Sequence, residues 1–209
     1  MPKKKSSELA NRLGRQFRTL EATQKRIEHL YQRDLLSKQA ILRMYEGMFL
    51  TAHISIEAFL EDLFFGLLVS GKGLESSRPD VLARVEIKSH RMARNLAHGT
   101  GKPYIDWLPF DQTLKLAKLF FQGGRPFTDL GNPHKDAISR SHYIRNAIAH
   151  KSRYSLYQFN RHVIQSVPLP PHERTPAGYL RGLFRAAPRQ SRFSNLLARL
   201  LLCARELSK

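Results

Sequence analysis

Arg145, Asn146 and His150 are the residues whose types and spacing best suit chemistry. They lie in the run of residues 132–164, whose apolar side chains recur at helical spacing and predict one continuous helix with the three residues in its middle. Arg145 precedes His150 by five residues, which is about 140° around a helix. A long guanidinium can still swing toward the imidazole from there. The pattern therefore predicts a cation, an amide and an imidazole on one helix face, with room for a phosphate.

A second stripe supports a shared face. His142, Asn146, His150 and Arg153 follow one another at steps of four, four and three residues. The spacing alone leaves an alternative open, in which this is a solvated helix face with a histidine at its buried edge.

These residue types suit the cleavage of RNA, which carries its own nucleophile in the 2′-hydroxyl. A histidine moves protons near neutral pH. An arginine binds phosphate oxygens and stays charged. Asn146 could orient the imidazole or donate to phosphate. Because no carboxylates and histidines stand at ligand spacing beside the motif, we expect neither a metal ion nor another cofactor.

The pattern Arg145, four residues, His150 resembles the motif of the HEPN family, closest to its RiboL-PSP-HEPN branch. The stretch of residues 54–64, an apolar helix interrupted by acidic residues, resembles the early HEPN helix. The resemblance implies an all-α helical bundle, a metal-independent endoribonuclease, and a homodimer in which two motif helices face each other. It covers a core of about residues 35–164. The amino-terminal helix of residues 6–33 and the basic carboxyl-terminal segment of residues 172–209 would be additional.

An acidic line precedes the motif. Glu46, His53, Glu57 and Glu61 fall at spacings of seven, four and four residues on an otherwise apolar helix. A buried carboxylate needs a partner. The line faces either water or an arginine of the motif helix such as Arg145. The resemblance favours the second alternative and makes Glu57 a candidate catalytic residue.

Length and composition predict one domain of 209 residues that folds without disulfides, since Cys203 is the single cysteine. The first residues lack the apolar core of a signal peptide. The most apolar stretch, residues 48–69, contains acidic residues and a histidine, so it is a poor membrane span. We therefore expect a cytoplasmic protein that is not inserted in a membrane.

The formal net charge is +18, from 35 Lys and Arg against 17 Asp and Glu. Residues 151–209 hold eleven Lys and Arg against Glu173 and Glu206. This excess favours a polyanionic partner, nucleic acid first and an anionic membrane surface second. We predict that Lys151, Arg153 and His142 contact the nucleic acid.

The remaining helices are predicted from caps and breakers. A second helix should follow Ser37 and end near residues 71–73, and a third, residues 112–122, should be capped by Asp111 and end at Gly123–Gly124. Asn132 and Pro133 should begin the motif helix.

Arg94-Asn95-Leu96-Ala97-His98 echoes the motif, and Arg91 adds a second Arg–His pair. A Gly-rich stretch follows His98 directly, so we expect it at a helix end and without a catalytic role.

The motif and the resemblance thus predict a HEPN-type endoribonuclease in stress response or in defence against foreign genetic elements, with an antitoxin or another defence-system protein as a further partner. The alternatives are a non-catalytic RNA- or DNA-binding module of the same fold, or a regulatory dimerisation partner. RNA cleavage separates the first from the others.

Overall fold

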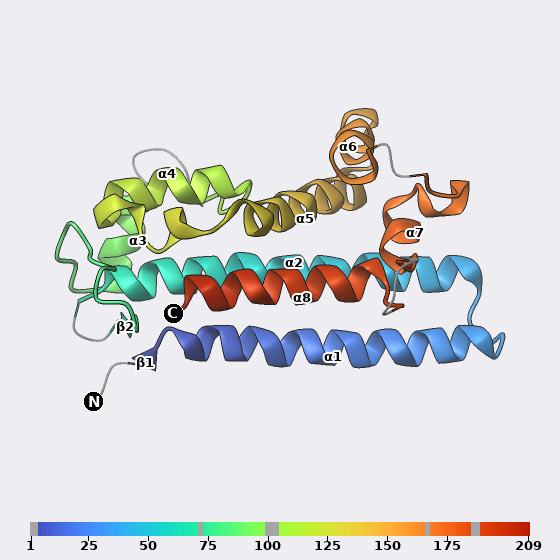
Figure 1. Ribbon diagram of the computed structural model, residues 1–209, viewed down its shortest axis with the longest axis horizontal. Helices are drawn as coiled ribbons and strands as arrows, with labels where there is room; N and C mark the ends of the chain where they lie inside the picture. The colour runs from blue at the N-terminus through green and yellow to red at the C-terminus, as the bar shows by residue number, and fades with distance from the viewer. Residues whose placement is uncertain (1–3, 71–72, 99–104, 166–167, 185–188) are drawn as a thin grey trace. The chain divides into compact units, whose positions relative to one another are not determined.

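The computed structural model describes residues 4–70, 73–98, 105–165, 168–184 and 189–209. The fold is all-α, as predicted. Figure 1 follows the elements along the chain from blue to red. The α-helices are α1 (Ser7–Gln32), α2 (Lys38–Leu68), α3 (His90–His98), α4 (Phe110–Phe120), α5 (Asn132–His150), α6 (Arg153–Phe159), α7 (Pro176–Arg181) and α8 (Arg192–Leu207).

Short elements connect these helices. The 3-10 turns are η1 (Gln122–Gly124), η2 (Phe127–Asp129) and η4 (Pro171–Glu173), and η3 (Asn160–Ile164) is a π-helical turn that continues α6. Two residues of β1 (Lys4–Lys5) pair in parallel with two of β2 (Leu74–Glu75).

The chain divides into two compact units, each assembled from segments that are distant in sequence. The first unit comprises Met1–Gly14, Ile56–Ile138 and Leu201–Lys209, and the second comprises Arg15–Ser55 and Ser139–Leu200. The motif residues 145–150 belong to the second unit. The predicted single domain and its HEPN-like core of residues 35–164 stay predictions.

Aromatic rings dominate the core of the first unit. Phe64 of α2 packs against Trp107, Phe121 and Phe127 with ring centroids 5.2, 5.2 and 5.7 Å away. All four rings are almost fully buried. The apolar carboxyl half of α2 supplies the centre of this cluster.

The second unit has its own core. Tyr45 of α2 meets Phe193 of α8 edge to face, and Phe159 at the end of α6 meets Tyr179 of α7 in the same manner. Tyr45, Phe193 and Phe159 are fully buried. This core joins α2, α6, α7 and α8, and α5 adds Ile144 and Ile148 to the buried set.

Helix starts agree with the predictions at two of three places. The backbone N–H of Ala40 donates to Ser37 Oγ at 3.1 Å, so Ser37 caps α2. α5 begins at Asn132, as the Asn–Pro pair predicted. The predicted cap of the third helix was wrong: α4 begins at Phe110 after Pro109. Asp111 lies within the first turn, where its charge favours the exposed N–H groups without capping them.

The predicted continuous helix over residues 132–164 was also wrong. α5 ends at His150, Lys151 takes a left-handed conformation with φ of 50°, and α6 begins at Arg153. Ser152 caps the new helix, because its Oγ accepts the N–H of Ser155 at 3.1 Å. His150 is therefore the last residue of its helix rather than a mid-helix residue, and Arg153 belongs to the next one.

Candidate functional site

The last two turns of α5 hold the predicted residues in contact with one another. Nη1 of Arg145 lies 3.2 Å from Nε2 of His150 and donates to Oδ1 of Asn146 at 3.1 Å. Nδ2 of Asn146 lies 3.0 Å from Nε2 of His142. The structure thus links His142, Asn146, Arg145 and His150 through hydrogen bonds, and the guanidinium swings to the histidine as its length allows.

The chemistry of the donors fixes the direction of these bonds. A guanidinium has no acceptor, so Nε2 of His150 must accept from Arg145 and carry no proton. The neighbouring ring is fixed in the same way, because Oδ1 of Asn146 already accepts and Nδ2 can only donate to His142. In this arrangement the lone pair of Nε2 of His150 is occupied by Arg145.

Arg145 keeps one edge of its guanidinium for a ligand. Both contacts use Nη1, and within the described chain neither Nε nor Nη2 has a hydrogen-bonding partner. The Nε and Nη2 protons form the fork that binds two oxygens of a phosphate. Arg145 is half-buried and His150 is exposed, so an RNA strand can reach both.

The three residues predicted to contact nucleic acid differ in their exposure and in their partners. Lys151 is exposed and its Nζ lies 3.4 Å from Oε2 of Glu46, which engages part of its charge. Arg153 is exposed at the first position of α6. His142 is half-buried, and its Nε2 lies 3.0 Å from Nδ2 of Asn146. Their roles stay predictions.

Glu57 and the echo of the motif belong to the first unit. Glu57 is half-buried on α2 in the first unit, whereas Arg145 belongs to the second, so a pairing between them stays a prediction. Glu61, also predicted on the acidic line, forms an ion pair with Arg94 at 2.8 Å. His98 is the last residue of α3, as expected for a helix end, but its side chain lies outside the described residues.

His53 is the site neighbour whose importance the sequence did not reveal. Its ring is 1% exposed and lies 6.5 Å from the ring of His142, centroid to centroid. Burial, with smaller contributions from the nearby His142 and Arg145, lowers the pKa of His53 from 6.5 to about 3. The ring is therefore neutral beneath the motif. Its place on the acidic line was visible in the sequence, but its burial was not.

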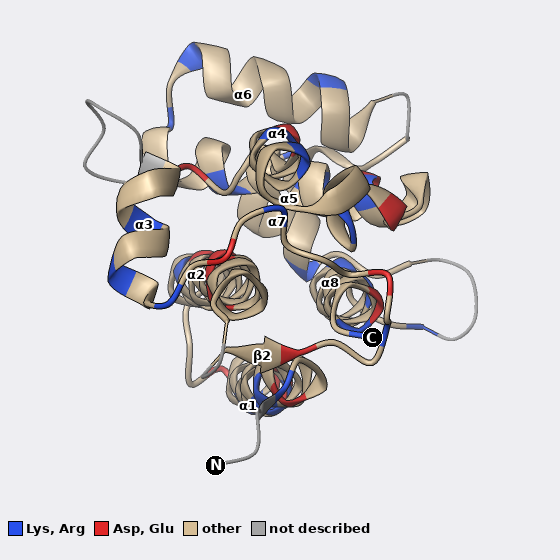
Figure 2. Ribbon diagram, turned by 90° about the vertical axis from the view of Figure 1, so that its left-hand side faces the viewer, with Lys and Arg blue, Asp and Glu red and all other residues tan. Residues whose placement is uncertain are grey.

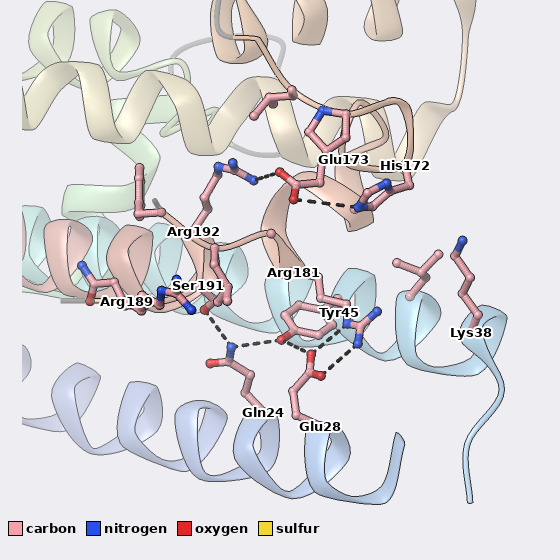
Figure 3. Close-up of a pocket in the computed structure, with 18 of the residues that line it drawn as sticks. Gln24, Glu28, Lys38, Tyr45, His172, Glu173, Arg181, Arg189, Ser191 and Arg192 are labelled. Atoms are coloured by element: carbon pink, nitrogen blue, oxygen red, sulfur yellow. Dashed lines mark hydrogen bonds and ion pairs between the residues drawn. The ribbon is translucent and has the colours of Figure 1, made fainter. Parts of the chain in front are cut away.

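A separate pocket of about 790 Å³ lies in the second unit, lined by residues of α1, α2, α7 and the start of α8. Figure 3 shows its polar groups meeting from these segments. Glu28 accepts two hydrogen bonds from Arg181, at 2.9 and 3.0 Å, and one from Tyr45 Oη at 2.8 Å. Gln24 donates to Tyr45 and to Ser191.

These groups satisfy one another, which indicates a network that holds the helices together. Burial, with Glu28 adding to it, raises the pKa of Tyr45, so its hydroxyl stays protonated. No motif residue lines the pocket. The partners are separated by up to 167 residues, so no local pattern could have predicted them.

Among the residues that the structure describes, no three His, Cys, Asp or Glu side chains gather closely enough to hold a metal ion. Within the same residues, no helix is long and apolar enough to cross a bilayer. No family model, curated protein or solved structure matches the chain. The resemblance to the HEPN family therefore stays a prediction based on the motif and on residues 54–64.

Proposed function

We propose that the protein is a metal-independent endoribonuclease of the HEPN type, with Arg145 and His150 at its site. The observation that carries the proposal is the 3.2 Å contact between Nη1 of Arg145 and Nε2 of His150. It brings a permanent cation and an unprotonated imidazole nitrogen together at an accessible helix end. The formal charge of +18 adds attraction for a polyanion.

In the proposed reaction the substrate phosphate displaces Nε2 of His150 from Arg145. The Nε and Nη2 edge of Arg145 binds the phosphoryl oxygens, where negative charge builds up. His150 then accepts the proton of the 2′-hydroxyl, and the 2′-oxygen bonds to phosphorus as the bond to the 5′-oxygen breaks. The products are a 2′,3′-cyclic phosphate and a 5′-hydroxyl, once the leaving oxygen has gained a proton.

His150 accepts the proton of the 2′-hydroxyl, so a second group must give a proton to the leaving oxygen. We propose that His150 of a second copy supplies it in a homodimer whose motif helices face each other. Light scattering that finds only monomer at tens of micromolar would contradict this part of the proposal. The proposed setting is the cytoplasm, in stress response or defence, with an antitoxin or defence-system protein as a further partner.

RNA cleavage by purified variants tests the proposal. His150→Ala should reduce the rate by about 10²–10⁴-fold, the usual contribution of a positioned acid–base group. Arg145→Ala should cost about 10²–10³-fold, as expected for one transition-state donor. His98→Ala, in the echo of the motif, is the matched control and should cleave like wild type. If the wild-type protein binds RNA and never cleaves it, a binding module is the better description.

A further inference from the structure

Helix α6 presents tyrosines to solvent directly after the motif. Tyr154 and Tyr157 are 72% and 54% exposed, and they stand three residues apart, so they share one face. The opposite face buries Ser155 and Phe159. Tyr154 follows His150 by four residues, which limits the distance between their Cα atoms to about 14 Å. Tyr154 therefore lies within a short reach of the candidate site, and Tyr157 stands three residues further along α6.

Cations accompany these rings. Nη1 of Arg161 donates to Oη of Tyr157 at 3.3 Å, which steadies the ring from one side. From residue 137 to residue 172 the chain has five Lys and Arg and neither Asp nor Glu. Figure 2 accordingly shows blue and no red on α6. This run is thus uniformly basic and carries exposed aromatic rings, the combination that binds single-stranded nucleic acids.

We infer that Tyr154 and Tyr157 form a stacking platform that holds unpaired bases of single-stranded RNA next to Arg145 and His150. The inference rests on the proposed ribonuclease function. Bases of a single strand expose their faces to aromatic side chains, whereas paired bases keep theirs inside the duplex. The platform would thus restrict cleavage to unpaired RNA and give the chain a preference that phosphate contacts alone do not supply.

A second copy of the chain is the rival occupant of this surface. A twofold interface would bring the same face of α6 together with itself, so Arg153 and Arg161 of each copy would approach the like charges of the other. Like charges across an interface oppose association. Arg153 and Arg161 therefore favour a polyanion, and not the same face of a second copy, on these tyrosines.

Binding of a short 2′-O-methyl RNA strand, followed by fluorescence anisotropy, tests the platform. This probe has no 2′-hydroxyl and cannot be cleaved by the proposed reaction, so affinity is measured independently of catalysis. Tyr154→Ala and Tyr157→Ala should each weaken binding by roughly 5- to 100-fold, the usual loss on removing one stacking ring. Tyr154→Phe should keep the affinity, because the ring remains. Leu119→Ala, which truncates a 68% exposed side chain on α4, is the control and should bind like wild type.

Two further probes separate stacking from charge. One probe is a duplex of the same strand, and the other is an abasic strand of equal length. Each should bind both alanine variants with the same affinity as wild type. The platform would be overturned if the alanine variants lost as much affinity for the abasic strand as for the intact single strand. It would also be overturned if their affinity for the single strand were unchanged. A dimer that becomes monomeric on Tyr157→Ala would assign the surface to a second copy and overturn it as well. Loss of cleavage in His150→Ala bears on the ribonuclease alone, since binding of the uncleavable strand does not depend on it.

Discussion

Arg145 reaches His150 across five residues of α5 and places Nη1 3.2 Å from Nε2 of the imidazole. The same nitrogen donates to Asn146, so one guanidinium nitrogen holds both neighbours while the fork of Nε and Nη2 stays open. The geometry explains why a long, planar cation stands at this position. It leads to a prediction about which replacement the site tolerates.

Arg145→Lys should recover only part of the activity lost in Arg145→Ala. An ammonium keeps the charge but lacks the planar fork, so it cannot hold His150, Asn146 and two phosphoryl oxygens together. Asn146→Ala should cost less than either, because its amide only steadies Arg145 and His142. Initial cleavage rates under saturating RNA provide the comparison. Equal rates for Arg145→Lys and wild type would show that charge alone suffices.

His53 predicts an acid sensitivity of the fold. Its pKa is about 3 in the folded protein and 6.5 in the unfolded chain, so between these values the unfolded chain binds a proton that the folded protein does not. Stability that is complete above pH 6.5 is therefore lost as the pH falls from 6.5 toward 3, by an amount on the order of 5 kcal/mol. Urea unfolding of wild type and His53→Gln from neutral to acidic pH measures it. Parallel losses in both proteins would remove His53 as the cause.

Gly182 should resist replacement by alanine because of a buried ion pair. Arg192 Nη1 lies 2.6 Å from Oε2 of Glu173, and their side chains are 9% and 18% exposed. A Cβ at position 182 would collide with that nitrogen and lie 2.7 Å from Oε2 of Glu173. Gly182→Ala should destabilise the protein by about 1–3 kcal/mol, since the pair must separate in a partly buried place.

Two controls isolate this effect. Gly47→Ala, where a Cβ meets nothing within 4 Å on helix α2, should instead stabilise by about 0.5–1 kcal/mol through helix propensity. On an Arg192→Ala background, the cost of Gly182→Ala should largely vanish, because the two changes share one partner. An unchanged cost there would point to the backbone instead.

The local patterns predicted the elements that local chemistry determines. Ser37 caps α2, Asn132 and Pro133 begin α5, and a turn with two left-handed glycines follows α4. The contact between Arg145 and His150 also followed from spacing and side-chain length. Each of these features depends on a few neighbouring residues.

The break after His150 and the burial of His53 depended on more distant packing. Lys151 takes a left-handed conformation that lysine rarely adopts. The sequence has no glycine or proline there that would indicate the end of the helix. The cap Ser152, with Ser155 three residues on, was the available signal. The ring of His53 is buried where the ring of His142 on α5 lies 6.5 Å away, centroid to centroid. Such contacts between α2 and α5 are not encoded in the periodicity of either helix.

Salt should weaken RNA binding steeply. Displaced counterions make the logarithm of the affinity fall linearly with the logarithm of the salt concentration, with a slope of about −0.7 per phosphate contact on a single strand. With 35 Lys and Arg in the chain, several contacts are expected. Titrations between roughly 50 and 200 mM salt measure the slope. A flat response would mean that the charge serves solubility.

The central claim is that the 2′-hydroxyl of the RNA is the nucleophile and that Arg145 and His150 promote its attack. The most direct measurement is cleavage, in the presence of EDTA, of an RNA with one preferred site and of the same RNA with a single 2′-deoxy nucleotide there. We expect the first strand to yield a 2′,3′-cyclic phosphate and the second to stay intact at that site. Cleavage of the 2′-deoxy strand at the same place and rate, or the loss of all cleavage in EDTA, would contradict the account.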